Sequence, residues 1–106
     1  MLKKMRRRYL ALNLDCEEAL SSRDFMSAVW AAFLKLYGEY GASKTALSLI
    51  EYDDEQKFAV LRTSHTTVDM VRAALASITR IEEKPVAVHV LKISGTIKAL
   101  FKKMKM

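Results

Sequence analysis

The chain has 106 residues, of which 51% are hydrophobic and 28% are charged. This balance is typical of a globular protein with one modest core, so we expect a single domain over residues 1–106. No apolar run approaches the roughly 20 residues of a membrane span, and the N-terminus lacks an apolar signal segment. We therefore expect a cytoplasmic protein.

Charge is distributed unevenly along the chain, whose formal net charge is +6. Five basic residues lie within residues 1–8 and five more within residues 92–106, and neither segment contains an acid. All twelve acidic residues lie in residues 9–91, together with eight of the eighteen bases. Such segregation predicts a distinct cationic surface, which favours a polyanionic partner.

The first predicted elements are a strand and a helix. Residues 8–14 (RYLALNL) alternate between apolar and other residues, which predicts a half-buried strand. Residues 21–24 (SSRD) have the pattern of a helix start, and the glycines at 38 and 41 are expected to end the helix. The predicted buried stripe of this helix consists of Phe25, Val29, Phe33, Leu36 and Tyr40.

The remaining elements follow in the order strand, strand, helix, strand, helix. Strands are predicted at residues 44–52 and 57–63, around a polar turn. Residues 66–69 (TTVD) again resemble a helix cap, ahead of an apolar stripe at Val68, Val71, Leu75 and Ile78. Pro85 opens a fourth strand over residues 86–93, and a basic helix follows Ser94-Gly95-Thr96.

This order, β-α-β-β-α-β plus a C-terminal helix, predicts an α+β fold of the ferredoxin-like, RRM-related class. Right-handed crossovers and the strand order 4-1-3-2 make the four-stranded sheet antiparallel throughout. One edge then collects both basic segments, with Lys44, Arg62 and His65. The opposite edge collects ten of the twelve acids, which are Asp15, Glu17, Glu18, Asp24, Glu51, Asp53, Asp54, Glu55, Glu82 and Glu83.

The start of the C-terminal helix has two interpretations. Its first backbone N–H groups lack partners within the helix, so Ser94-Gly95-Thr96 is either an ordinary cap or part of a phosphate site. Basic residues arriving from the other terminus favour phosphate binding. Lysine and arginine would hold an RNA or DNA backbone without reading its sequence.

Several aromatic residues admit both a structural and a binding role. Tyr9 and Phe58 could stack on RNA bases, but core packing beneath the C-terminal helix is the favoured interpretation. Core packing is also favoured for Trp30 and Phe33. The first helix and the acidic edge are candidates for a protein partner.

No protein-borne active site is indicated. His65 and His89 have no second ligand at metal-binding spacing, and Cys16, the only cysteine, is expected to pack near a strand end. Residues 53–55 (DDE) are better explained as a solvated turn than as a cation site. We find no nucleophile with a base at motif spacing and no glycine-rich phosphate loop.

Taken together, these segments resemble the protein component 2 family of archaeal ribonuclease P, related to a small subunit shared by eukaryotic ribonuclease P and MRP. The likeness is carried by RRRYLAL (6–12), LSSRDFMSAVWAAFLKLYGEYGAS (20–43), FAVLRTSH (58–65), VRAALASITRI (71–81) and VLKISGTIKAL (90–100). Nearly the whole chain takes part. Family members often carry a longer C-terminal segment.

The resemblance implies an accessory, RNA-binding subunit of an endoribonuclease that removes 5′ leaders from precursor tRNA. Catalysis would lie in the RNA with magnesium, and the protein would bind no cofactor itself. Partners would be the ribonuclease P RNA, the TIM-barrel-like component 3 and other ribonuclease P proteins, with a homodimer inside a heterotetramer as one arrangement. The residues expected to contact RNA phosphates are Arg6, Arg7, Arg8, Arg62, Lys92, Thr96, Lys98, Lys102 and Lys103.

Two other classes of function remain open at this point. One is a ferredoxin-like homo-oligomeric module that binds a small ligand between subunits, which predicts weak and salt-insensitive RNA retention. The other is a protein scaffold, for which the cationic edge would be dispensable. RNA binding over a salt series separates them.

Overall fold

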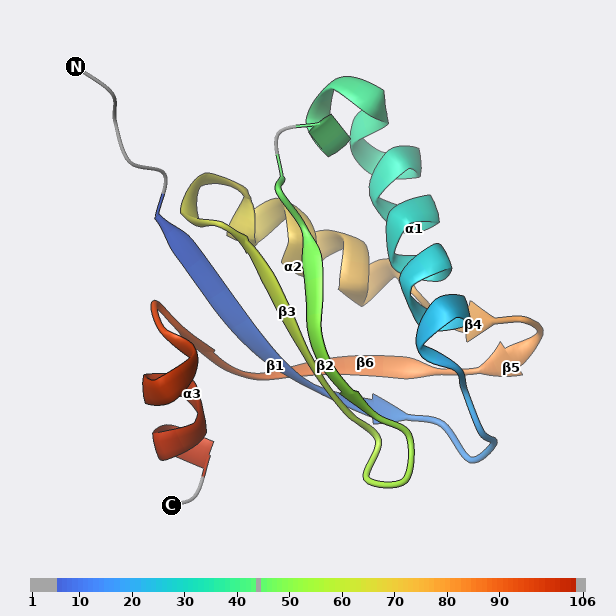
Figure 1. Cartoon of the computed structure of the whole chain (residues 1–106). Coiled ribbons are helices and arrows are strands. Elements are labelled where there is room, and N and C mark those ends of the chain that lie inside the picture. The colour runs from blue at the N-terminus through green and yellow to red at the C-terminus, as the bar shows by residue number, and fades with distance from the viewer. Residues whose placement is uncertain (1–5, 44, 105–106) are drawn as a thin grey trace.

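The structure is a computed structural model that describes residues 6–43 and 45–104, with the side chains of residues 40–43 and 101–104 outside the description. Figure 1 shows an α+β arrangement, as the sequence predicts. The elements are β1 (Arg7–Asp15), α1 (Ser22–Ser43), β2 (Ser48–Asp53), β3 (Phe58–Ser64), the 3₁₀ turn η1 (His65–Thr67), α2 (Val68–Ser77), β4 (Arg80–Ile81), β5 (Lys84–Pro85), β6 (Ala87–Ser94) and α3 (Ile97–Met104).

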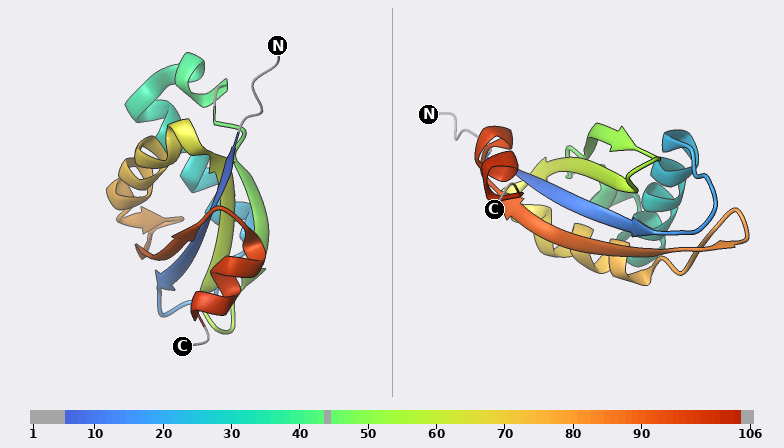
Figure 2. Two further views of the ribbon diagram at one scale, coloured as in Figure 1. Left: turned by 90° about the vertical axis from the view of Figure 1, so that its left-hand side faces the viewer. Right: turned by 90° about the horizontal axis from the view of Figure 1, so that it is seen from below.

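The main sheet has four strands in the order β2-β3-β1-β6, and every neighbouring pair is antiparallel. This confirms the predicted ferredoxin-like topology and strand order. In the register, Tyr9 of β1 lies opposite Arg62 on one side and Ser94 on the other. Helices α1 and α2 cover one face of the sheet, and α3 lies on the other (Figure 2).

The core between the sheet and the two longer helices follows from the alternation in β1 and the stripe of α1. Leu10, Leu12 and Leu14 point to this face and are buried. Phe25 and Phe33 are fully buried against them, and Trp30 packs half-buried at the border of the core. Burying these two phenylalanine side chains stabilises the folded state by about 3–6 kcal/mol, so they anchor α1 to the sheet.

The predicted stripe of α1 is wrong at one position. Leu36 is 48% exposed, although its spacing from Phe25 and Phe33 places it on the same helix face. The next residue, Tyr37, one turn after Phe33, packs half-buried against the core instead, with its ring centroid 4.9 Å from that of Phe33. Tyr40 lies outside the described side chains.

The start of α1 is as predicted, whereas the predicted end at the glycines is only partly correct. The Asp24 N–H donates to Ser21 Oγ at 3.1 Å, which is an N-cap hydrogen bond. Gly38 has φ 72° and ψ 179°, a conformation essentially confined to glycine, and the helix kinks there before continuing to Ser43. Gly41 lies within this continuation, so it does not end the helix as predicted.

Two local predictions are wrong. Thr67 does not cap α2, because its hydroxyl hydrogen-bonds the Ser64 carbonyl and the Thr63 hydroxyl at the end of β3. Pro85 does not open the fourth long strand, because it belongs to an unpredicted β4–β5 hairpin. The turn of that hairpin, residues 82–83, has both φ angles positive, as tight two-residue hairpins require.

A second, smaller cluster lies under α3. Leu100 is fully buried against Ala11 and Val60, and the half-buried rings of Tyr9 and Phe58 pack around them. This confirms the packing role predicted for both aromatics. Helix α3 therefore covers part of the sheet face that would otherwise offer these rings for stacking on bases.

Candidate nucleic-acid interface

The described parts of the two basic segments, residues 6–8 and residues 92–98, come to one end of the sheet. The N–H of His65, just after β3, donates to the Arg6 carbonyl at 2.8 Å, and Arg7 lies opposite Ser64 in the register. On the other side of β1, Tyr9 lies opposite Ser94, where β6 gives way to α3. Figure 1 shows the start of β1 beside the start of α3. The convergence predicted from topology is therefore present.

We call this surface the cationic rim. It consists of Arg6, Arg7, Arg8, Arg62, Lys92, Thr96 and Lys98. Arg8 and Arg62 are half-buried, and the others are exposed. In residues 6–43 and 45–104 the side-chain ion pair present is Lys57–Asp54, which lies at the far end of the sheet. No described carboxylate forms an ion pair with the rim, so its cations remain available to an anion.

Other basic residues named from the sequence lie outside the description. Lys102 and Lys103 belong to α3, but their side chains are not described. Four more lysines that the sequence places at or near the rim lie outside the described residues. They are Lys3, Lys4, Lys44 and Lys105.

The start of α3 has an ordinary N-cap, and the guanidinium of Arg8 from β1 lies beside it. Thr96 Oγ1 accepts the Ala99 N–H at 3.1 Å, which is the N-cap hydrogen bond. A Cβ atom placed on Gly95 would lie 3.5 Å from Arg8 Nη1, so the guanidinium lies directly against this turn. The cap interpretation is correct for the Thr96 hydroxyl, and the Arg8 charge adds to the partial positive charge of the helix end.

His65 and Arg62 have structural contacts at the rim. His65 Nδ1 lies 3.2 Å from the Arg6 carbonyl, so the ring and the backbone of His65 both hold the entry to β1. This agrees with the structural role predicted for His65. Arg62 Nη2 donates to Ser48 Oγ at 3.5 Å across β3 and β2, which directs its guanidinium along the sheet surface.

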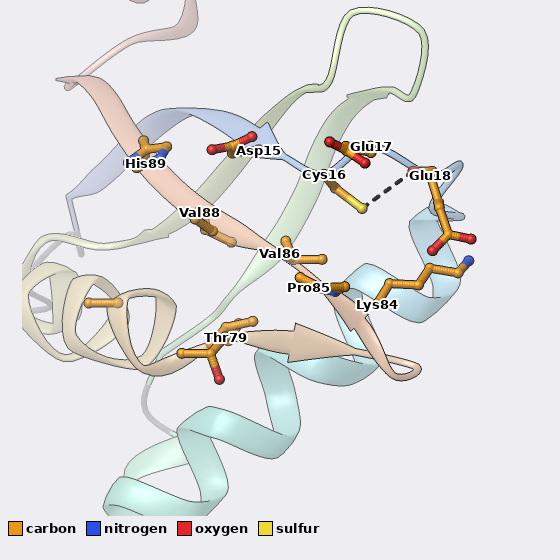
Figure 3. Close-up of a pocket in the computed structure, with 13 residues that line it drawn as sticks. Asp15, Cys16, Glu17, Glu18, Thr79, Lys84, Pro85, Val86, Val88 and His89 are labelled. Carbon is orange, nitrogen blue, oxygen red and sulfur yellow. Dashed lines mark hydrogen bonds between the residues drawn. The ribbon is translucent and has the colours of Figure 1, made fainter.

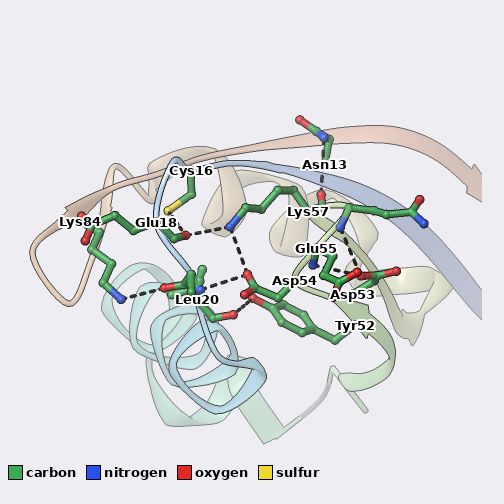
Figure 4. Close-up of polar contacts among 12 residues, drawn as sticks. Asn13, Cys16, Glu18, Leu20, Tyr52, Asp53, Asp54, Glu55, Lys57 and Lys84 are labelled. Carbon is green, nitrogen blue, oxygen red and sulfur yellow. Dashed lines mark hydrogen bonds and ion pairs between the residues drawn. The ribbon is translucent and has the colours of Figure 1, made fainter.

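The opposite end of the sheet is built around the loop between β1 and α1 (Figure 4). The Leu20 N–H donates to Asp54 Oδ1 at 3.0 Å, and the Tyr52 hydroxyl donates to the Leu20 carbonyl. Lys57 donates to the Glu18 carbonyl and Lys84 to the Ala19 carbonyl, each at 2.8 Å. The loop that carries Glu17 and Glu18 is therefore held from three other segments of the chain.

The same contacts shift two pKa values. The Leu20 N–H, followed by the Lys57 ammonium, lowers the pKa of Asp54 below its usual value. Burial, followed by the charge of Asp54, raises the pKa of Tyr52 to about 12. Asp53 Oδ1 accepts the Glu55 and Gln56 N–H groups at 3.0 and 3.2 Å, so the turn uses these carboxylates as structural acceptors, as expected of a solvated turn.

The sequence did not predict that two lysines at this end would hydrogen-bond backbone carbonyls of the loop between β1 and α1. Lys57 is 39 residues from Glu18, and Lys84 is 65 residues from Ala19, so no local pattern links them. Cys16 is buried and donates to the Glu18 carbonyl at 3.3 Å, in agreement with the packing role predicted for it.

Within the described ranges, no group of three His, Cys, Asp or Glu side chains is placed to hold a metal ion. Across the same ranges, no helix has the length and apolarity needed to span a membrane.

The structure is thus a ferredoxin-like domain with a C-terminal helix, and one end of its sheet carries the cationic rim. The Rpp14/Pop5 family model matches residues 8–105, and the chain belongs to this family. Similar curated proteins include ribonuclease P protein component 2 of Methanosarcina mazei, 34% identical over 93 residues that cover 88% of this chain and 78% of the relative. The protein of the same name from Pyrococcus abyssi is 31% identical and covers 91% and 81%.

A solved structure has the same fold. A chain in the cryo-EM structure of yeast ribonuclease MRP superposes with a TM-score of 0.73 and covers 99% of this chain and 95% of that chain. The sequence identity is 15%, so the likeness concerns the fold. It extends over the C-terminal helix as well as the ferredoxin-like unit.

Proposed function

We propose that this chain is the RNA-binding protein subunit of a ribonuclease P, supporting the catalytic RNA as it removes 5′ leaders from precursor tRNA. Membership of the Rpp14/Pop5 family and the names of its archaeal relatives support the role. The single observation that carries the RNA contact is the cationic rim, assembled from residues near both ends of the chain, with which no described carboxylate forms an ion pair. The small-ligand module considered above is not favoured by these comparisons.

The rim acts by electrostatics. The basic side chains of the rim replace counterions along the RNA backbone, with Thr96 beside them. These side chains are Arg6, Arg7, Arg8, Arg62, Lys92 and Lys98. Positive charge fixed by the protein lowers the magnesium concentration at which closely packed RNA helices can form. Magnesium belongs to the RNA in this scheme, where the chemistry takes place, and the protein supplies charge and shape.

The subunit works within a larger particle. Its proposed partners are the ribonuclease P RNA, the TIM-barrel-like component 3 and the remaining ribonuclease P proteins, and a homodimer would complete a heterotetramer with component 3. The location is the cytoplasm.

The proposal is tested by reversing charge at the rim. The variant Arg6→Glu, Arg7→Glu, Arg8→Glu, Lys98→Glu is assembled with the RNA and partner proteins, and precursor tRNA cleavage is followed across a magnesium series. We expect activity at low magnesium to be lost and to recover as magnesium rises. Unchanged activity at low magnesium would refute the role of the rim.

A matched control places the same number of reversals elsewhere. Arg23, Lys35, Arg72 and Arg80 are exposed and lie on α1, α2 and β4. Their replacement by glutamate changes the net charge equally. The magnesium dependence of this control is expected to stay near that of the wild type, because local charge at the rim, and not the total, governs the RNA contact.

A further inference from the structure

A groove lies at the end of the molecule opposite the cationic rim. It is bounded by the end of β1, the end of α2 and the segment from β5 into β6, and its volume is about 770 Å³ (Figure 3). Ile78, Val86 and Val88 form an apolar floor that belongs to the main core. The groove is large enough to take one or two apolar side chains of a peptide.

The edge of this groove is anionic. Asp15, Glu17 and Glu18 line it and are exposed, and in the described part of the chain none of their carboxylates is in an ion pair. The one lysine among the lining residues, Lys84, already donates to the Ala19 carbonyl. The Lys84 ammonium is therefore engaged in holding the loop and forms no ion pair with these described carboxylates, which leaves them available to a partner.

The backbone of the loop that carries Glu17 and Glu18 is held in place before any partner arrives. Backbone atoms of residues 18–20 are fixed by Asp54, Lys57 and Lys84, and the Cys16 thiol donates to the Glu18 carbonyl at the groove wall. A loop fixed in this way loses little conformational entropy when it is bound. Carboxylates carried on a fixed backbone beside an apolar floor form a complementary surface for cations that flank an apolar side chain.

We propose that this groove docks a basic segment of another protein of the particle, with an apolar side chain on the floor and lysine or arginine residues against Asp15, Glu17 and Glu18. The inference rests on the proposed function for its setting, the ribonuclease P particle. RNA does not fit the groove, because its phosphates would face these carboxylates. The two ends of the domain thus separate two partners, RNA at the cationic rim and a cationic protein segment at the groove.

Site-specific photocrosslinking in the reconstituted holoenzyme tests this assignment. A benzophenone amino acid replaces Ala76, which is exposed and lines the groove, and in a second protein it replaces Lys92 of the rim. We expect Ala76 to crosslink to a lysine- or arginine-rich protein segment and Lys92 to crosslink to RNA. Crosslinks from Ala76 to RNA, to an acidic or uncharged protein segment, or to nothing would overturn the groove proposal.

The crosslinks at the two positions test two different proposals. Loss of RNA crosslinks at Lys92 would count against the proposed function, whereas loss of protein crosslinks at Ala76 counts against the groove. Both measurements come from the same assembled particle.

Charge reversal gives a second measurement. Glu17→Lys with Glu18→Lys is expected to weaken incorporation into the particle by about tenfold or more, since like charges would then oppose the basic segment. Glu51→Lys with Glu55→Lys is the matched control, with the same change in net charge near the same end but outside the groove lining. Equal weakening by both pairs, or by neither, would contradict a specific groove. Thermal unfolding of each variant reports whether the fold is kept.

Discussion

The salt dependence of RNA binding offers a quantitative test of the cationic rim. Arg7, Lys92 and Lys98 are exposed and come from three elements, β1, β6 and α3. Replacing all three by alanine removes charge without removing any hydrogen bond that their side chains make in the described structure. The fold is therefore expected to persist, and the change in affinity reports the loss of phosphate contacts.

The magnitude follows from counterion release. If each of the six described arginines and lysines of the rim neutralises one phosphate, the logarithm of the association constant falls against the logarithm of salt with a slope of about −5.4. Removing three reduces the slope to about −2.7. Between 50 and 200 mM salt, the wild type then loses roughly 10³ in affinity, and the triple variant loses only about 40-fold.

The assay measures binding to ribonuclease P RNA at four or more salt concentrations, with Arg23→Ala, Lys35→Ala, Arg80→Ala as the matched control. The control has the same net charge as the rim variant, but its substitutions lie on α1 and β4. Its slope is expected to stay near that of the wild type. A rim variant with the wild-type slope, or a control with an equally reduced slope, would refute the reasoning.

Three further predictions concern stability. Gly38→Ala is expected to destabilise the fold by about 1–3 kcal/mol in urea unfolding, because φ 72° strains any L side chain even though a Cβ there meets no atom within 4 Å; an unchanged midpoint would contradict this. Leu100→Ala should weaken the docking of α3 by about 2–5 kcal/mol, seen as faster hydrogen exchange in α3, and unaltered protection would count against it. The pKa of Tyr52 is about 12 in the folded state and 10.0 ordinarily, so the unfolded chain loses this proton first as the pH rises. The free energy of unfolding of the wild type should therefore fall between pH 10 and pH 12, and Tyr52→Phe should lack that part of the decline when unfolding is measured across this pH range.

Local sequence patterns determined most of the fold. Alternation in residues 8–14 specifies which leucines face the helices, because the side-chain period of a strand is two. Ser21 and Gly38 mark the limits of the regular part of α1 through a hydrogen bond and a backbone conformation that each depend on residue type. Element order and crossover handedness then place the two basic segments at one end, so the rim was predictable before any coordinates were known.

What only the tertiary structure decided depends on contacts between distant segments. Thr67 looks like a cap, but its hydroxyl bonds to the end of β3. Leu36 fits the stripe of α1 but is exposed, while the adjacent Tyr37 packs against Phe33. Lys57 and Lys84 act on carbonyls of a loop far away in the sequence. Patterns within a helix or strand record only the preferences of that element, whereas a hydrogen bond between segments dozens of residues apart depends on where the whole chain has folded.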